Sequence, residues 1–179
     1  MGEHYPNKEF QPMVMCDRKV AQGTGDIAVE PAMTQEQCLR AILAGIEVVA
    51  DLSTQGYEMI GMGEMGIGNT TPSSALVSVL LNLPAEEVTG RGAGLSDASY
   101  NKKVAVIEQA VKRYWKATED SEIPDGPFFK IDAAVELMSH LGGYEIAAMA
   151  GMCLGGAVFG VPIVLDGYIS AAGALCASL

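Results

Sequence analysis

A stretch of chain without any charged residue, Ile146 to Leu165, most constrains how this sequence can fold. Its length is about that of a membrane-spanning helix. However, glycine and alanine dilute the stretch, Pro162 interrupts it, and every lysine and arginine of the chain lies at or before Lys130. A membrane span normally has basic residues at its flanks, which set its orientation. We therefore expect a core segment rather than a membrane span, with Val161 to Leu165 forming a short buried strand between two helices.

The composition narrows the class of protein further. The chain has 179 residues, of which 49% are hydrophobic and 18% charged, and its formal net charge is −11. This length and apolar content predict one domain with a real core and exclude an intrinsically disordered chain. Acidic residues outnumber basic ones 22 to 11, which argues against nucleic acid as a partner because phosphate backbones bind to basic faces.

Cysteine and histidine usage predicts neither a metal site nor a disulfide framework. The four cysteines include no Cys-x-x-Cys pair, and neither His4 nor His140 has a partner at metal-ligand spacing. The N-terminus shows no signal-peptide pattern, so reduced thiols and a cytoplasmic location are expected. Most cysteines are expected to fill an aromatic-poor core, together with four methionines: Met59, Met62, Met149 and Met152.

Helix and strand patterns alternate along the chain. Thr34 and Gln37 form a capping-box pattern that predicts a helix to about Thr54, and Gly56 follows where a helix end favours a left-handed residue. Strands are expected at 57–62 and 161–165. Helices are expected at about 73–82, 97–116, 130–141 and 144–159 and after Gly167, with residues 1–19 as an irregular lead-in. This order predicts an α/β fold with a parallel, Rossmann-like sheet flanked by helices, and no internal sequence repeat is apparent.

The strongest local feature is the glycine-rich loop after the first predicted strand. In parallel α/β sheets, ligands bind at the carboxyl ends of strands beside helix N-termini. Gly66 and Gly68 allow the backbone to approach a ligand closely. Asn69, Thr70 and Thr71 then supply capping side chains for a helix whose first-turn N–H groups and dipole favour an anion. The loop predicts a phosphate site, although an ordinary glycine turn with a helix cap has the same pattern.

This loop does not fit the two common nucleotide motifs. Gly61 to Gly66 satisfies Gly-x-Gly-x-x-Gly, but a dinucleotide fingerprint opens its helix inside the motif, whereas Pro72 places this helix later. No Gly-Lys-Ser/Thr sequence follows, which excludes a P-loop. A simple phosphate monoester fits better than NAD or ATP, and we expect no cofactor.

A second glycine cluster has the same layout. The run through Gly92 and Ala93 ends at Ser96, a suitable N-cap for the long helix that follows. Lys102 and Lys103 lie early in that helix. One of them could neutralise a phosphate, but both could equally be solvated surface lysines.

Two acidic residues follow the predicted strands. Glu64 lies between glycines, where a carboxylate has little structural purpose, and is a candidate to bind ribose hydroxyls or to stabilise developing positive charge. Asp166 is placed similarly, after the strand at 161–165 and before Gly167. It could have the same function, but we favour an N-cap of the last helix.

These motifs together resemble a single family. The run Gly63-Glu64-Met65-Gly66-Ile67-Gly68-Asn69-Thr70-Thr71-Pro72, followed by Gly92-Ala93 and Lys103, is similar to that of the nicotinate-nucleotide–dimethylbenzimidazole phosphoribosyltransferases of cobalamin lower-ligand assembly. The similarity includes Gly23-Thr24-Gly25-Asp26-Ile27 and Pro162-Ile163-Val164-Leu165-Asp166-Gly167, so it covers nearly the whole chain from about Val20.

The resemblance implies a reaction and a set of site residues. Phosphoribose would pass from nicotinate mononucleotide to a benzimidazole-type base, giving alpha-ribazole phosphate and nicotinate. Glu64 would be the catalytic carboxylate, and the phosphate and ribose would be held by Gly66, Gly68, Asn69, Thr70, Thr71, Gly92, Ala93 and Lys103. The resemblance also implies a homodimer and an α/β fold with a parallel sheet.

The sequence departs from the family in one respect. Members are about twice this length, and their general-base glutamate lies in a Gly-Glu-Gly-type segment that falls beyond Leu179. We therefore expect residues 1–179 to be the central part of a single phosphoribosyltransferase domain, incomplete at both ends. We also expect the chain to be inactive unless another chain or segment completes it. The alternative is a catalytically inactive module that binds a nucleotide phosphate.

Overall fold

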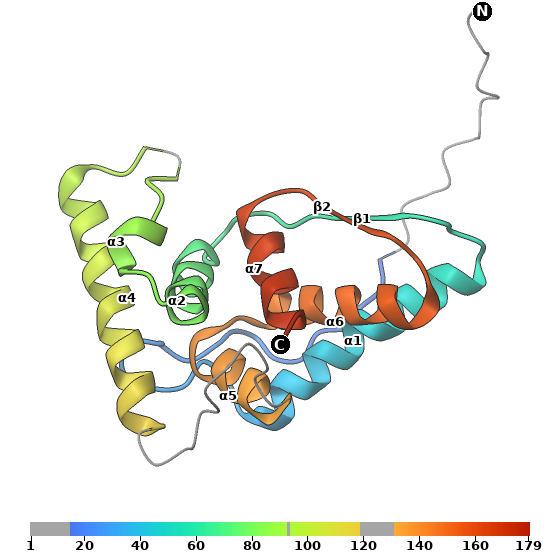
Figure 1. Ribbon diagram of the computed structural model, residues 1–179, viewed down its shortest axis with the longest axis horizontal. Coiled ribbons are helices and arrows are strands. Elements are labelled where there is room, and N and C mark those ends of the chain that lie inside the picture. Colours follow the sequence, from blue (N-terminus) through green and yellow to red (C-terminus); the bar gives the residue numbers. More distant parts are fainter. Residues whose placement is uncertain (1–14, 93, 119–130) are drawn as a thin grey trace, which may run out of the picture.

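The computed structural model of the chain describes residues 15–92, 94–118 and 131–179, and helices predominate in them (Figure 1). The helices are α1 (Gln35–Thr54), α2 (Thr70–Leu81), α3 (Ala85–Val88), α4 (Asp97–Ala117), α5 (Ile131–Leu141), α6 (Tyr144–Phe159) and α7 (Tyr168–Ala177). The strands are β1 (Ile60–Met62) and β2 (Ile163–Leu165).

The two strands form a parallel pair, as expected, but a small one. Ile60 is opposite Ile163 and Met62 is opposite Leu165. Each strand is three residues long, so the described part of the chain holds a two-stranded sheet rather than a full Rossmann-like one. The predicted strands were too long because Pro162 has no N–H to donate, although its carbonyl still accepts from the Ile60 N–H at 3.0 Å.

The prediction that the second strand is buried was wrong. In β2, Ile163 is half-buried, whereas Val164 and Leu165 are exposed. Met59 is also 63% exposed, although we expected it in the core, because the chain before β1 lies outside the paired segment. Met62 and Met149 are buried as predicted, and Met152 packs at the edge of the core.

Most helix boundaries agree with the sequence patterns. α1 begins with the predicted capping box, in which the Gln37 N–H donates to Thr34 Oγ1 and the Thr34 N–H donates to Gln37 Oε1. α2 begins at Thr70, three residues earlier than expected. The connection at 83–88, which we had not expected to be helical, contains the single turn of α3.

The same order of elements occurs twice in the structure, although the sequence shows no repeat. α1 is followed by Gly56 (φ +85°) and β1, and α6 is followed by Gly160 (φ +68°) and β2. Equivalent elements are neighbours: α1 packs on α6, β1 pairs with β2, and α2 packs on α7 (Figure 1). The carboxyl ends of β1 and β2 therefore lie at one edge, next to the N-termini of α2 and α7.

Glycines bring α1 and α6 into backbone contact. A Cβ on Gly45 of α1 would overlap the Ala148 carbonyl oxygen of α6, and a Cβ on Gly151 of α6 would overlap the Ile42 carbonyl oxygen of α1. The uncharged stretch thus begins as a core helix, with Ile146 and Ala147 fully buried. Among the described residues, no helix is long and apolar enough to cross a membrane.

A guanidinium group joins α4 to α5 and to the segment before α1. Arg113 donates from Nε to the Ile27 carbonyl (3.1 Å) and from Nη2 to the His140 carbonyl (3.1 Å). The His140 ring lies edge-on to Tyr114, with ring centroids 5.6 Å apart. Burial, and then the positive charge of Arg113, lower the pKa of His140 below its usual value.

Replacing Gly151 by alanine should destabilise the fold. The added methyl group would push α6 away from the α1 backbone, and overpacking of this kind costs about 1–3 kcal/mol, more than the gain in helix propensity recovers. Urea unfolding should show a lower midpoint for Gly151→Ala. The control is Gly23→Ala, where a Cβ has no neighbour within 4 Å and the midpoint should be unchanged. Equal midpoints for the two variants would refute the backbone contact.

The lowered pKa of His140 predicts how stability depends on pH. Because the folded state binds the proton less readily than the unfolded state, the free energy of unfolding should fall as pH decreases through about 6.5, the unfolded value. Thermal unfolding between about pH 7.5 and pH 5.5 should show this loss, and His140→Gln should reduce it. An identical pH dependence in the variant would contradict the assignment.

Candidate functional site

Lys103 of α4 brings the two glycine-rich segments together. Its Nζ donates to Thr70 Oγ1 (2.9 Å), at the first residue of α2, and approaches the Gly90 carbonyl oxygen (3.5 Å) just before the second glycine cluster. Lys103 is half-buried and Lys102 is exposed. The interpretation of both lysines as solvated surface residues is therefore wrong for Lys103.

The surroundings of Lys103 suit an anion. Burial lowers the pKa of its ammonium group from the usual value, since part of its hydration is lost. The N-terminus of α2 lies beside it, where first-turn N–H groups and the positive end of the helix dipole favour negative charge. The ammonium group and the helix end therefore converge on one place, as a phosphate site requires.

The loop between β1 and α2 keeps its backbone accessible. Gly66 (φ +70°) and Gly68 (φ +76°) are left-handed, and a Cβ on either would meet no atom within 4 Å. A substitution at these positions would thus strain the backbone rather than cause a clash. Met65, just before Gly66, and Ile67, between the two glycines, are exposed.

Asn69 does not cap α2 with its side chain, contrary to our expectation. It occupies the N-cap position, but its Nδ2 donates to the Glu64 carboxylate at 2.7 Å. The Thr70 hydroxyl accepts from Lys103 instead of capping. The bond to Glu64 uses the Asn69 donor Nδ2, while Oδ1, the atom that a cap would use, accepts no hydrogen bond among the described residues. Because Asn69 does not cap the helix, the first-turn N–H groups of α2 stay available to a ligand.

Glu64 is half-buried and folds back onto its own loop. Besides Asn69 it accepts a hydrogen bond from the Gly66 N–H. Asn69 is 4% exposed, and its Oδ1 has no hydrogen-bond partner among the described residues. The structure thus places Glu64 beside the predicted phosphate loop, with its carboxylate also holding the shape of that loop.

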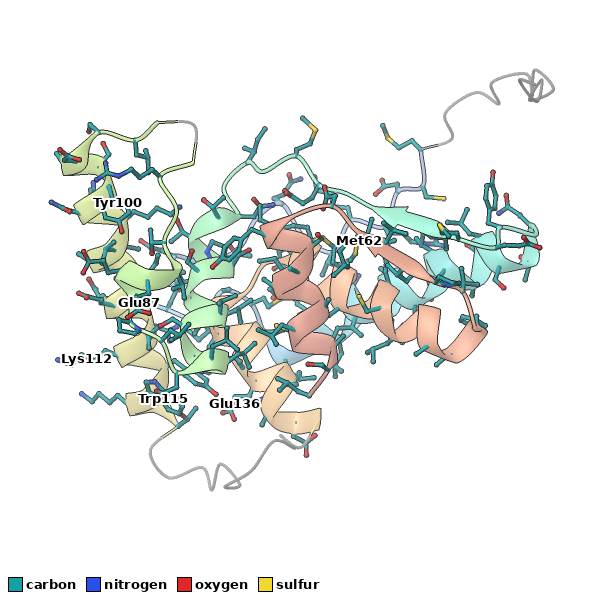
Figure 2. The ribbon with its side chains drawn as sticks, turned by 45° about the horizontal axis from the view of Figure 1, so that its top comes forward. Met62, Glu87, Tyr100, Lys112, Trp115 and Glu136 are labelled. Atoms are coloured by element: carbon teal, nitrogen blue, oxygen red, sulfur yellow. The ribbon has the colours of Figure 1, made fainter. Side chains whose placement is uncertain are left out.

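The second glycine segment is fixed by a residue that sequence reasoning missed. Arg91 pairs with Asp97 (2.7 Å) and lies over the Tyr100 ring, 4.6 Å from its centroid. Gly92 (φ +53°) and Gly94 (φ +99°) are both left-handed, whereas Ala93 lies outside the described residues. The only hint in the sequence was a basic residue between two glycines. Figure 2 shows Tyr100 and Trp115 near opposite ends of α4.

Tyr168, also missed, ties the start of α7 to the same region. Its hydroxyl donates to the Val88 carbonyl (2.9 Å), two residues before Gly90, and lies 3.4 Å from Ser74 Oγ of α2. The N-termini of α2 and α7 therefore lie on the same side of the molecule as the second glycine segment. No pattern in the sequence indicates this contact.

The prediction that Asp166 is the N-cap of α7 was wrong. Gly167 is the N-cap residue, and the Ser170 hydroxyl accepts from the backbone N–H groups of Asp166 (3.2 Å) and Gly167 (3.0 Å). The carboxylate of Asp166 instead lies against Gly63, because a Cβ on Gly63 would be 3.4 Å from Asp166 Oδ2.

A cavity of about 560 Å³ borders the loop on its other side. Its walls come from segment 16–24, from α1, from the start of α6, and from the loop residues Ile67, Gly68 and Pro72. The loop therefore has Lys103 on one side and open space on the other. Among residues 15–92, 94–118 and 131–179, no group of acidic, cysteine or histidine side chains could hold a metal ion.

The contact between Asn69 and Glu64 can be tested by one substitution. Asn69→Asp replaces the donor by a second carboxylate facing Glu64, so the free energy of unfolding near neutral pH should fall by about 1–3 kcal/mol. The control is Asn101→Asp on the exposed face of α4, which should change it by less than about 0.5 kcal/mol. Similar urea midpoints for the two variants would mean that the Asn69 contact does not stabilise the loop.

Comparison with known proteins places the chain among phosphoribosyltransferases. A family model described as phosphoribosyltransferase matches residues 3–179. The nicotinate-nucleotide–dimethylbenzimidazole phosphoribosyltransferase of Chlorobaculum tepidum is 41% identical over 177 residues, which cover 99% of this chain and 46% of that protein. The protein of the same name from Chlorobium chlorochromatii is 46% identical with the same coverage.

The fold is also similar to that of a solved relative. CobT from Thermus thermophilus aligns with a TM-score of 0.77 and 38% identity, covering 90% of this chain and 44% of that structure. The chain spans about half the length of the relatives it matches. The match over nearly all of its residues shows that the chain belongs to the phosphoribosyltransferase family that includes the nicotinate-nucleotide–dimethylbenzimidazole enzymes.

Proposed function

We propose that this protein transfers phosphoribose from nicotinate mononucleotide to a benzimidazole-type base, giving alpha-ribazole phosphate and nicotinate for the cobalamin lower ligand. The observation that carries the proposal is Lys103, which joins Thr70 at the N-terminus of α2 to Gly90 at the second glycine segment. Residues far apart in the chain thus meet at one lysine beside a helix N-terminus, which supports a phosphate site there. The names of the relatives give the substrates.

In this proposal the 5′-phosphate of the donor lies between Lys103 and the first turn of α2. The ammonium group supplies charge, and backbone N–H groups supply directed hydrogen bonds. The residues that hold phosphate and ribose are Gly66, Gly68, Asn69, Thr70, Thr71, Gly92, Ala93 and Lys103. The left-handed glycines allow the loop to lie close to the ligand without side chains between them.

Glu64 is the proposed catalytic carboxylate. As the bond between C1′ and the nicotinate nitrogen breaks, its electron pair leaves with nicotinate, and positive charge develops on C1′ and the ring oxygen. A carboxylate held beside that charge lowers the barrier electrostatically. Its hydrogen bonds from Gly66 and Asn69 orient Glu64 before the substrate binds.

Completion of the reaction needs a second group. The accepting base must lose its ring proton as the new C1′–N bond forms, which calls for a general base. In the family this is a glutamate of a Gly-Glu-Gly-type segment, which residues 1–179 do not contain. We propose that these residues alone bind the donor without completing the transfer, and that a further segment or another chain supplies the base.

The surroundings of the sheet support a larger assembly. The faces of parallel sheets are normally covered on both sides, whereas Val164 and Leu165 of β2 are exposed among the described residues. We propose that β1 and β2 belong to a wider Rossmann-like parallel sheet in a cytoplasmic homodimer. The similarity to a solved structure of which this chain covers 44%, with a TM-score of 0.77, supports a larger fold around the two strands.

Titration with nicotinate mononucleotide tests the proposed site. Lys103→Ala should weaken binding by about tenfold or more, since a hydrogen bond to a charged group contributes about 1.5–3 kcal/mol. Lys102→Ala, which removes a neighbouring exposed lysine, is the matched control and should bind as the unsubstituted chain does. Calorimetry measures both.

Two outcomes would contradict the proposal. If the folded, unsubstituted chain does not bind nicotinate mononucleotide, the phosphate site is wrong. If it binds but the chain, supplied with the completing segment and a benzimidazole base, releases no nicotinate, then the alternative function as a non-catalytic binding module is correct.

A further inference from the structure

We propose that Asp166 is a second carboxylate of this site and accepts a hydrogen bond from a ribose hydroxyl of the phosphoribosyl donor. The inference deepens the proposed function and rests on it. It starts from the two equivalent units of the fold, α1–β1–α2 and α6–β2–α7. In each unit an acidic residue follows the strand closely. Glu64 follows β1 by two residues, and Asp166 follows β2 directly.

The pairing of the strands brings these acidic residues to one edge. Met62 is opposite Leu165 in a parallel register, so the chain leaves both strands in the same direction. The Asp166 carboxylate lies against Gly63, the residue between β1 and Glu64. A Cβ at position 63 would be 3.4 Å from Asp166 Oδ2, at van der Waals contact with the carboxylate.

Asp166 is not needed to build the helix that follows it. The Ser170 hydroxyl accepts from the backbone N–H groups of Asp166 and Gly167, and the N-cap position expected of Asp166 belongs to Gly167. Within the described part of the chain, the hydrogen bonds of Asp166 use its backbone, and its side chain is exposed. Glu64, by contrast, is held by Gly66 and Asn69.

The location of Asp166 relative to the proposed phosphate site indicates which part of the ligand it would contact. Tyr168, two residues after Asp166, donates to the Val88 carbonyl and lies beside Ser74 of α2. Val88 shortly precedes Gly90, which Lys103 contacts. Asp166 thus lies at the junction between β2 and α7, the helix that packs on α2 (Figure 1).

The chemistry of the donor fits this arrangement. In a nucleoside monophosphate the ribose is bonded directly to the phosphate, so the groups next to a bound phosphate meet the sugar. Ribose hydroxyls donate hydrogen bonds, and an acidic residue after a strand of an α/β sheet is a common acceptor for them. Asp166 would form or break no covalent bond. It would orient the sugar so that C1′ faces Glu64.

Three ligands separate ribose binding from phosphate binding: nicotinate mononucleotide, ribose 5-phosphate and inorganic phosphate. For Asp166→Asn we expect the dissociation constants of both ribose ligands to rise about tenfold and that of inorganic phosphate not to rise. Lys103→Ala should raise all three. Glu58→Gln, an exposed acid-to-amide change before β1, is the matched control and should change none. Asp166→Ser is a second variant, and thermal unfolding checks that each variant is folded.

The outcomes are distinct. Unchanged ribose 5-phosphate affinity in both Asp166 variants overturns the inference while leaving the phosphate site intact. A loss of inorganic phosphate affinity equal to the loss for the ribose ligands also overturns it, since Asp166 would then act on the phosphate site as a whole. If the unsubstituted chain binds none of the three ligands, the proposed function fails, and this inference fails with it.

Discussion

The backbone contact between α1 and α6 is the constraint on which the rest of this structure depends. Gly45 and Gly151 let each helix approach the carbonyl groups of the other, which fixes their distance and their relative rotation. Because Gly56 and Gly160 then reverse the chain into β1 and β2, the positions of the helices set the register of the strands. The strand ends in turn place α2, α7 and the glycine-rich loop. A side chain at the helix contact would thus disturb elements that it does not touch.

The candidate site is a local exception to the charge of the whole chain. With a net charge of −11, the long-range field of the protein repels a phosphate. At physiological ionic strength, salt screens that field beyond about 8 Å, so contacts at short range decide whether an anion binds. Lys103 and the first turn of α2 provide such contacts, and Arg91 does not, because Asp97 and Tyr100 hold its guanidinium group. For the binding of an anion, one lysine at short range therefore contributes more than the net charge of the chain.

Much of the fold was predictable because the relevant signals are local. The capping box at Thr34 defines the start of α1, and the spacing of apolar residues gives the other long helices. The strands were predicted too long, since their ends depend on pairing rather than on the apolar run, and Pro162 interrupts that pairing. The exposure of Val164 and Leu165 depends on which elements cover the sheet, and the sequence of the strand does not contain that information.

In the candidate site, too, some features follow from local sequence patterns, and others depend on contacts between distant residues. The glycine loop was found from residue type and spacing, whereas Lys103 was selected over Lys102 by the resemblance to the family. In the structure Lys103 contacts Thr70 at the end of that loop. The roles of Asn69 and Asp166 were not foreseen, because each depends on a competing partner elsewhere in space or sequence. Glu64 draws the Asn69 amide away from the helix end, and Gly167 rather than Asp166 is the N-cap residue of α7. Tyr168 joins residues 80 positions apart, and no local pattern reports such a contact.

The separation of Lys103 from Thr70 by 33 positions also links ligand binding to folding. A chain that has lost the packing of α4 on α2 has no such site, so a phosphate ester would bind the native state and not the unfolded one. By mass action, a ligand present at a hundred times its dissociation constant would add about 2.7 kcal/mol to the free energy of unfolding. A phosphate ester bound at the proposed site would therefore protect the chain against unfolding and against proteolysis of its unfolded state.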